Sequence, residues 1–186
     1  SQKGNERKMH WRGRLWAMNR MVLTYILLFV LLVLLQVTVL NDISLFGYAT
    51  PFLYIYFILR LPSLMSANWV MSIAFLMGLI VDIFSNTPGM NALAATTIAF
   101  MRKPVLALVL PRSDEAVSIV PSISSLGLSH FIGYSFLMVI LFCVLIFVIE
   151  AFTFFSPLTL ILRFSSSAVF TFLLVLAADC LKPGKK

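Results

Sequence analysis

The sequence predicts an all-α membrane protein built as one bundle of six membrane-spanning helices. Hydrophobic residues make up 61% of its 186 residues and charged residues only 11%, a composition far from that of a soluble domain. Several apolar runs are about 20 residues long, the length that a helix needs to cross roughly 30 Å of hydrocarbon. The polar segments between these runs are too short for a separate soluble domain, so we expect a single membrane domain, residues 21–181.

The chain begins with a basic lead, residues 1–20, in which two tryptophans and six Lys and Arg residues accompany a single Glu. This composition is typical of a segment at the membrane interface, and a solvated tail is the alternative. The apolar run 21–40 follows and is the first predicted span. No small-residue cleavage site follows this run, which argues against a signal peptide.

Two prolines, Pro51 and Pro62, bracket a short second apolar segment. At 1.5 Å per residue this segment reaches only about half-way across the membrane. It must therefore borrow residues from 45–50, or be shielded by neighbouring helices while it stops short. Arg60, near its end, can extend toward the lipid headgroups.

The third predicted span, residues 68–84, ends close to Asp82, and the fourth begins at Pro88 and stops near Pro104. Proline is tolerated in the first turn of a helix, which suits this start. Small and weakly polar residues are frequent in the fourth span and allow another helix to approach closely. We expect a packing face, directed at a partner protein or a neighbouring span, formed by Ala92, Ala95, Thr96 and Ala99.

The fifth and sixth predicted spans are residues 128–155 and 158–181, and a basic tail, residues 182–186, follows them. In this six-span path all but one of the 14 Lys and Arg residues fall on the same side of the membrane. The positive-inside rule then places both termini in the cytoplasm, which agrees with an even number of spans. The exception is Arg163.

Three charged residues fall in the outer half of the predicted spans: Asp82, Glu150 and Arg163. Because a lone charge inside a membrane is costly, we expect Arg163 to be neutralised by Glu150, by Asp82 or by both. In the alternative, each charge reaches headgroups or water separately. For Asp82 we favour a structural role, either capping the corner between the third and fourth spans or pairing with the sixth, over proton or substrate chemistry.

Nothing in the sequence indicates an enzyme. His10 and His130 are not placed to work with a carboxylate, and the chain has no nucleophile motif, phosphate-binding loop or cluster of metal ligands. Cys143 and Cys180 lie in or at the end of apolar runs, so neither a disulfide framework nor a zinc site is indicated. The formal charge of +7 suits anionic lipid headgroups better than nucleic acid. We expect no cofactor, no metal and no nucleic-acid partner.

Two ordered motifs give the chain a family resemblance. The first is the proline-bracketed segment from Ala49-Thr50-Pro51-Phe52 to Arg60-Leu61-Pro62, and the second is a Gly-x-x-x-Asp…Gly-x-x-x-Leu pattern formed by Gly78, Asp82, Gly89 and Leu93. In both, the chain resembles the MreD family, the rod-shape-determining integral membrane proteins of bacteria. Pro88 stands where other members often carry Leu, and the fifth and sixth spans match the family only in hydropathy.

The resemblance implies a six-helix fold similar to the substrate-binding subunits of energy-coupling-factor transporters. It also implies a non-enzymatic scaffold of the cell-elongation machinery in the bacterial inner membrane. The implied partner is an MreC-like protein with one membrane helix and a periplasmic part, which would help to link MreB filaments to the glycan polymerase RodA and its transpeptidase. Membrane lipid is the other implied partner.

A small-molecule binding subunit of a membrane transporter, for a vitamin-like ligand, is the alternative function. The related transporter fold holds its ligand in a cavity near the outer face. A scaffold should co-purify with a single-span partner, whereas a binding subunit should retain a ligand and pair with an ATPase module. The residues that could converge on such a cavity are Asp82, Asn86, Asn91, Glu150 and Arg163.

Overall fold

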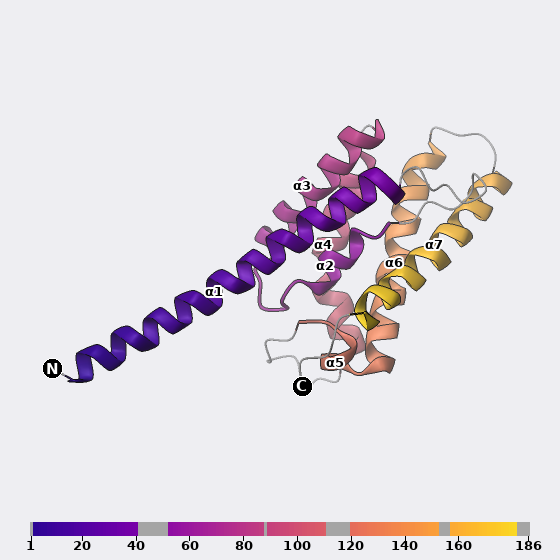
Figure 1. Cartoon of the computed structure of the whole chain (residues 1–186). Coiled ribbons are helices and arrows are strands. Elements are labelled where there is room, and N and C mark those ends of the chain that lie inside the picture. The colour runs from indigo at the N-terminus through magenta and orange to yellow at the C-terminus, as the bar shows by residue number, and fades with distance from the viewer. Residues whose placement is uncertain (1, 41–51, 88, 111–119, 153–156, 182–186) are drawn as a thin grey trace.

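All regular elements of the described chain are helices (Figure 1). The computed structural model describes residues 2–40, 52–87, 89–110, 120–152 and 157–181. The elements are α1 (Gln2–Leu35), the π-helical turn η1 (Gln36–Leu40), α2 (Ile55–Arg60), α3 (Ala67–Ser85), α4 (Met90–Val109), α5 (Ile123–Leu126), α6 (Leu128–Ala151) and α7 (Pro157–Cys180). The predicted all-α class is therefore confirmed.

Five of these helices, α1, α3, α4, α6 and α7, contain a stretch long and apolar enough to cross a membrane. The chain is a multi-pass membrane protein. The predicted second span is represented by α2, which has only six residues, so the predicted count of six spanning helices is not confirmed. Pro51 lies outside the described residues, and Pro62 follows α2 directly after its C-cap, Leu61.

Two predicted boundaries differ from the structure. The basic lead is not a separate element, because the backbone is already helical from Gln2 and continues into the span as one helix. The first part of α1 extends beyond the rest of the bundle (Figure 1). The predicted stop near Pro104 is wrong, since α4 continues through this proline to Val109. Proline is tolerated inside membrane helices when neighbouring groups bond the backbone atoms that it frees.

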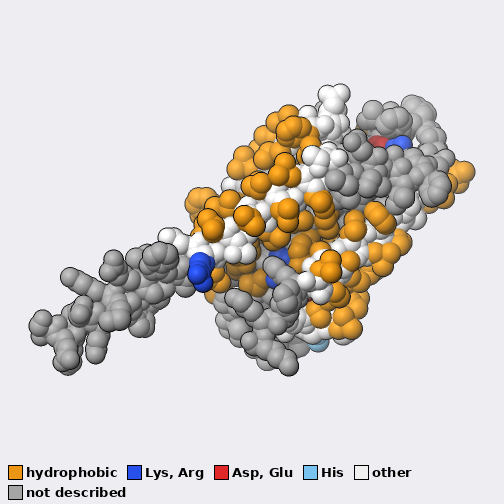
Figure 2. Space-filling view, in the orientation of Figure 1, with side chains coloured by type: hydrophobic (Ala, Val, Ile, Leu, Met, Phe, Trp, Pro, Cys, Tyr) orange, Lys and Arg blue, Asp and Glu red, His pale blue; other side chains and the backbone are white. Residues whose placement is uncertain are grey.

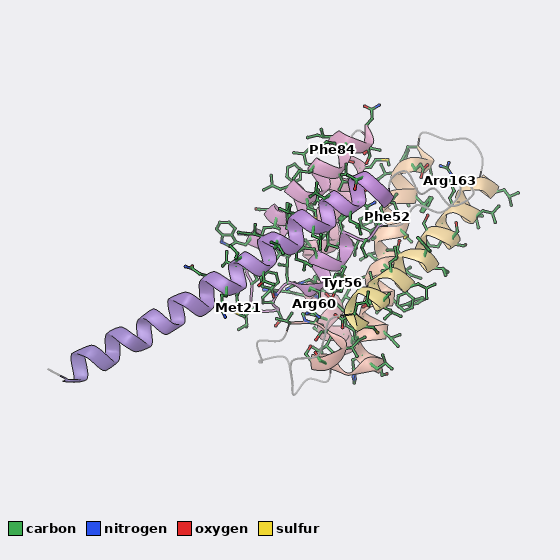
Figure 3. All side chains as sticks on the ribbon, viewed as in Figure 1. Met21, Phe52, Tyr56, Arg60, Phe84 and Arg163 are labelled. Atoms are coloured by element: carbon green, nitrogen blue, oxygen red, sulfur yellow. The ribbon has the colours of Figure 1, made fainter. Side chains whose placement is uncertain are left out.

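Contacts between helices show which ends lie together. The guanidinium of Arg102, in the second half of α4, reaches the backbone just after α2. Asp179, in the last turn of α7, pairs with Arg60, the last residue of α2. The ends of α2, α4 and α7 therefore meet at one end of the bundle, which we call the Arg60 end. Phe84 and Arg163 lie at the opposite end, which we call the Arg163 end (Figure 3).

The core is centred on α2. Its residues from Ile55 to Leu59 are all 2% exposed or less. The helix is only about 9 Å long, so neighbouring helices enclose it on all sides. Tyr25 and Phe29 of α1 meet Phe57 of α2 edge to face, with ring centroids 6.4 and 5.5 Å apart. The structure therefore shows the expected shielding by neighbouring helices, whereas residues 45–50, which the segment was expected to borrow in the other arrangement, lie outside the described residues.

The outward faces of the long helices are apolar. Much of the described surface in Figure 2 is hydrophobic. Such a surface would drive a soluble protein to aggregate, but it suits hydrocarbon. Large exposed apolar side chains on four of the spanning helices include Leu27, Leu31, Ile83, Val148 and Val169.

Candidate functional site

Asp82 closes the corner between α3 and α4. It lies in the last turn of α3 and is 3% exposed. Its Oδ2 accepts a hydrogen bond from the backbone N–H of Ala92 (2.8 Å), and its Oδ1 accepts from the backbone N–H and side-chain amide of Asn91 (3.0 and 2.9 Å) and from the hydroxyl of Thr87. Backbone N–H groups in the first turn of a helix have no partner within that helix, and the helix dipole favours a negative charge there. Of the two structural roles expected for Asp82, capping the corner or pairing with the sixth span, the structure shows the cap.

The same corner is tied to the segment that contains α2. The hydroxyl of Tyr54, a fully buried residue directly before α2, donates to Oδ1 of Asn91 (2.9 Å). The side chain of Asn91 therefore donates to Asp82 and accepts from Tyr54. One polar cluster thus joins α3, α4 and the buried segment in the core.

Gly78 allows α3 and α4 to pack with their backbones in contact. A Cβ atom added at Gly78 would lie 2.5 Å from the carbonyl oxygen of Asn91 and 2.6 Å from the Cα of Ala92. Both are backbone atoms, so no side-chain rotation could relieve the overlap. Gly89, the N-cap of α4, has a φ of +79°, a conformation that glycine adopts without strain. The two motif positions therefore favour glycine for different reasons: Gly78 because the α3 and α4 backbones are in contact there, and Gly89 because its φ is positive.

The predicted packing face of α4 lies inside the chain. Ala92, Ala95 and Ala99 are at most 3% exposed, and Thr96 is partly buried. Their small side chains are used to pack α4 within the bundle, so of the two predicted targets, the neighbouring span is the one that the structure shows. Leu93, the last residue of the motif, is 58% exposed and is outside this packed face.

We expect Asp82→Asn to be tolerated better than Asp82→Leu. Asparagine keeps one acceptor oxygen for the N–H groups of α4, whereas leucine leaves all of them without an acceptor. From the usual cost of leaving buried polar groups unsatisfied, the losses should be about 1–2 kcal/mol for Asn and about 3 kcal/mol or more for Leu. Unfolding followed by helical circular dichroism in detergent measures both. Equal losses would contradict a hydrogen-bonding role.

Side chains from other helices satisfy the backbone at both ends of the α2 segment. Before α2, the N–H of Phe52 donates to the hydroxyl of Thr171 (3.1 Å), and the N–H of Leu53 donates to Oε1 of Gln36 (3.0 Å). Both acceptor residues are fully buried, and they belong to α7 and to the turn that ends α1. A short helix leaves most of its backbone groups without internal partners, which is costly away from water.

Arg102 donates hydrogen bonds to backbone carbonyls at the C-terminal end of α2. Its Nη1 donates to the carbonyls of Ile58 (3.2 Å) and Leu61 (2.5 Å), and its Nη2 donates to that of Pro62 (2.6 Å). Arg102 is 1% exposed. From the sequence, Arg102 was predicted only as a charge on the cytoplasmic side, because the carbonyls that it binds lie about 40 positions away in the chain.

A second carboxylate, Asp179, joins three segments at the Arg60 end. Its Oδ1 accepts from Nη1 of Arg60 (2.5 Å) and from the hydroxyl of Tyr56 (3.0 Å), and its Oδ2 accepts from the N–H of Ile123 at the start of α5 (2.7 Å). Arg60 does not use its option of extending to the headgroups, because its side chain is only 13% exposed and is paired with Asp179. Asp179 was not among the residues predicted from the sequence. An acid in the last turn of an apolar run, as Asp82 also is, was the available signal.

The predicted cluster of Asp82, Glu150 and Arg163 is only partly formed. Nη1 of Arg163 lies 2.9 Å from Oε1 of Glu150, with 40% and 16% of the two side chains exposed. Asp82 is not part of this pair, since its oxygens are taken by α4. Asn86 is an exposed, left-handed C-cap of α3 with a φ of 53°. The five residues expected to line a ligand cavity therefore form separate sets of contacts.

Arg163→Leu and Glu150→Gln test the pair at the Arg163 end. Because the Arg163 side chain is 40% exposed, we expect a coupling of only about 0.5 kcal/mol, as for other exposed ion pairs. Unfolding free energies of the two single variants and the double variant, measured in detergent, give the coupling. Strictly additive losses would show that the pair contributes nothing.

The described residues hold no group of three or more His, Cys, Asp or Glu side chains placed to bind a metal ion. Cys143 and Cys180 are both free thiols. No family model, curated protein or solved structure matches the chain.

Proposed function

We propose that the chain is a non-enzymatic membrane scaffold that binds partner proteins through its lipid-embedded surface. One observation carries this proposal: three charged side chains buried in the bundle bond to the backbone of the bundle itself. Asp82, Arg102 and Asp179 each bind backbone groups of the chain itself. Groups used in this way stabilise an architecture and are not presented to a substrate.

In the finer form of the proposal, the chain is an MreD-like component of the cell-elongation machinery in the bacterial inner membrane. Its partner is an MreC-like single-span protein, through which it helps to connect MreB filaments with RodA and its transpeptidase. The motif residues support this form, because Gly78 and Asp82 are the two residues that build the α3–α4 corner. Their spacing therefore has a physical reason that a family could share.

The finer proposal also includes a six-pass path similar to the substrate-binding subunits of energy-coupling-factor transporters, with α2 as an incomplete second pass and both termini in the cytoplasm. The position of α2 supports the path. Leu53 bonds to Gln36 at the end of α1, and Arg60 bonds to Asp179 at the end of α7. The segment thus runs back toward the Arg60 end after α1.

The alternative, a vitamin-like binding subunit, requires polar groups that are open to a ligand. Asp82 and Asn91 are buried and bonded within the chain, while Glu150 and Arg163 are bonded to each other. A ligand would have to replace these bonds. The scaffold is therefore the better-supported function.

Co-expression tests the proposal. The tagged chain is produced together with the MreC-like protein encoded nearest to it, and the pair is purified in mild detergent. We expect one complex of fixed stoichiometry on size-exclusion chromatography, and no complex with an unrelated single-span protein as the control. Purification without this partner, but with a small molecule detected by mass spectrometry and an associated ATPase module, would favour the binding subunit.

A further inference from the structure

The face with which α1 packs on the bundle continues into the part of α1 that extends beyond the bundle. Tyr25 and Phe29 contact Phe57 of α2, and Leu32 is 5% exposed. These positions on α1 follow one another in steps of four and three, the a/d spacing of helices that pack along a seam. Toward the start of α1, the same alternation reaches four more apolar residues, which we call the Trp11 stripe: Val22, Met18, Leu15 and Trp11.

The described bundle does not cover the Trp11 stripe. Val22 is 55% exposed. Within the described part of the chain, no other helix lies beside residues 2–18 (Figure 1). The next seam position is Lys8, so the stripe ends there. An apolar stripe of this kind, bordered by polar residues, usually marks a surface that another molecule covers.

The membrane surface is not placed to cover the stripe. The span of α1 begins at Asn19, and α1 is one α-helix from Gln2 to Leu35. Sharp kinks occur at proline, at glycine pairs or at π-bulges, and residues 14–34 contain neither proline nor glycine. The extension therefore keeps the direction of the span. Trp11 lies about 12 Å beyond Asn19 along this axis, whereas the headgroup layer is roughly 5–8 Å thick.

Arginines flank the Trp11 stripe. With Leu15 as an a position, Arg7 and Arg14 occupy g positions and Arg12 an e position. Charges at e and g decide which helix can pair along a seam. Glu6, the one acid in this part of α1, occupies an f position, away from the seam. A helix that pairs here must therefore offer negative charge at its own flanking positions.

A second copy of the chain does not meet this requirement. In a parallel pair, Arg7 of one copy would face Arg12 of the other, and in an antiparallel pair the g-position arginines would face one another. Like charges across a seam oppose pairing. A helix with Glu or Asp at these positions would instead meet an opposite charge.

We propose that the Trp11 stripe binds a helix of another protein, which has an apolar seam and acidic residues on both sides of it. The partner helix continues the contact that α1 makes with the bundle, so that α1 is packed along one face on both sides of Asn19. This surface goes beyond the proposed function, because it lies outside the lipid-embedded surface. Either of the two can therefore fail without the other.

The full chain in nanodiscs of phosphatidylcholine, a lipid without net charge, tests the proposal. The probes are two fluorescent helical peptides with the same seam of Ile and Leu. One peptide has Glu at its e and g positions, and the other has Lys. Fluorescence anisotropy measures their binding. Trp11→Gln removes one residue of the stripe, and Trp16→Gln makes the same change at a b position as the control. Circular dichroism confirms that both variants are folded.

We expect the acidic peptide to bind about tenfold more tightly than the basic one, because several opposite-charge pairs replace like-charge pairs. Trp11→Gln should weaken the binding of the acidic peptide about thirtyfold, as for other tryptophan anchors of an interface, while Trp16→Gln leaves it unchanged. Equal binding of the two peptides, or equal effects of the two variants, would overturn the proposal.

Two further outcomes would assign the surface to another occupant. A single-stranded RNA oligonucleotide that binds as tightly as the acidic peptide, with the same dependence on Trp11, would overturn the helix in favour of nucleic acid. Tighter peptide binding after Asp114→Asn together with Glu115→Gln would show that acids of the chain itself occupy the arginines, which would overturn the partner protein.

Discussion

Replacing Gly78 with alanine should destabilise the protein by about 3 kcal/mol, the upper range for overpacking a tight contact. The new methyl group would lie 2.5 Å from a backbone oxygen and 2.6 Å from a backbone carbon of α4. Because neither atom can move without its helix, α3 and α4 must separate. Separation also lengthens the hydrogen bonds from α4 to Asp82. Thermal unfolding in detergent, followed by circular dichroism and by size-exclusion chromatography, measures the loss.

Gly133→Ala is the matched control. Gly133 is also a glycine inside a spanning helix, but a Cβ atom added there would lie 3.8 Å from the nearest atom, the side-chain Cγ1 of Val109. This is an ordinary van der Waals distance, so we expect no loss, or a small gain from the better helix propensity of alanine. If both variants were equally stable, the close approach of α3 and α4 would not be the reason for the motif glycine.

Replacing Arg102 with methionine should cost about 4 kcal/mol, from leaving several buried acceptors without a donor. Methionine has a similar length and fills the space, but the carbonyls of Ile58, Leu61 and Pro62 lose their partner. Arg102→Lys should recover part of the loss, because an ammonium group can reach some of these oxygens but not in the fork geometry of a guanidinium. The free energies of unfolding, measured in detergent, should decrease from the wild type to Arg102→Lys to Arg102→Met.

The adjacent residue supplies the control. Lys103 is exposed, and Lys103→Met removes the same charge from the same turn of α4. We expect a change of at most about 0.5 kcal/mol, as for other surface substitutions. A loss in Lys103→Met as large as that in Arg102→Met would mean that net charge, rather than the cap on α2, stabilises this end of the bundle.

Hydropathy located the spanning helices because hydrocarbon requires long apolar runs, whatever the rest of the fold does. The role of Asp82 was also predictable, since an acid followed at once by a turn and a new helix is a local pattern. The paired charges Glu150 and Arg163 belong to consecutive helices, so they too were within reach of the sequence. In each case the partners lie close together along the chain.

The interactions that hold α2 were not predictable in this way. Arg60 and Asp179 are 119 positions apart, and Phe52 is equally far from Thr171. One sequence contains no signal that joins such positions. The arginines were assigned to the membrane surface, because a basic residue next to an apolar run usually lies there. In this bundle both arginines lie inside, because Arg102 binds the backbone carbonyls at the end of the short helix α2 and Arg60 pairs with Asp179.

The bonds at the ends of α2 constrain how the protein is made. Gln36 is synthesised before α2, but Arg102 and Thr171 follow it by tens of residues. When α2 leaves the ribosome, most of the groups that will bind its backbone do not yet exist, and hydrocarbon offers no substitute. The α2 segment must therefore remain in contact with water, outside the hydrocarbon, until α4 and α7 have been inserted. The burial of α2 is therefore complete only when α7 is in place.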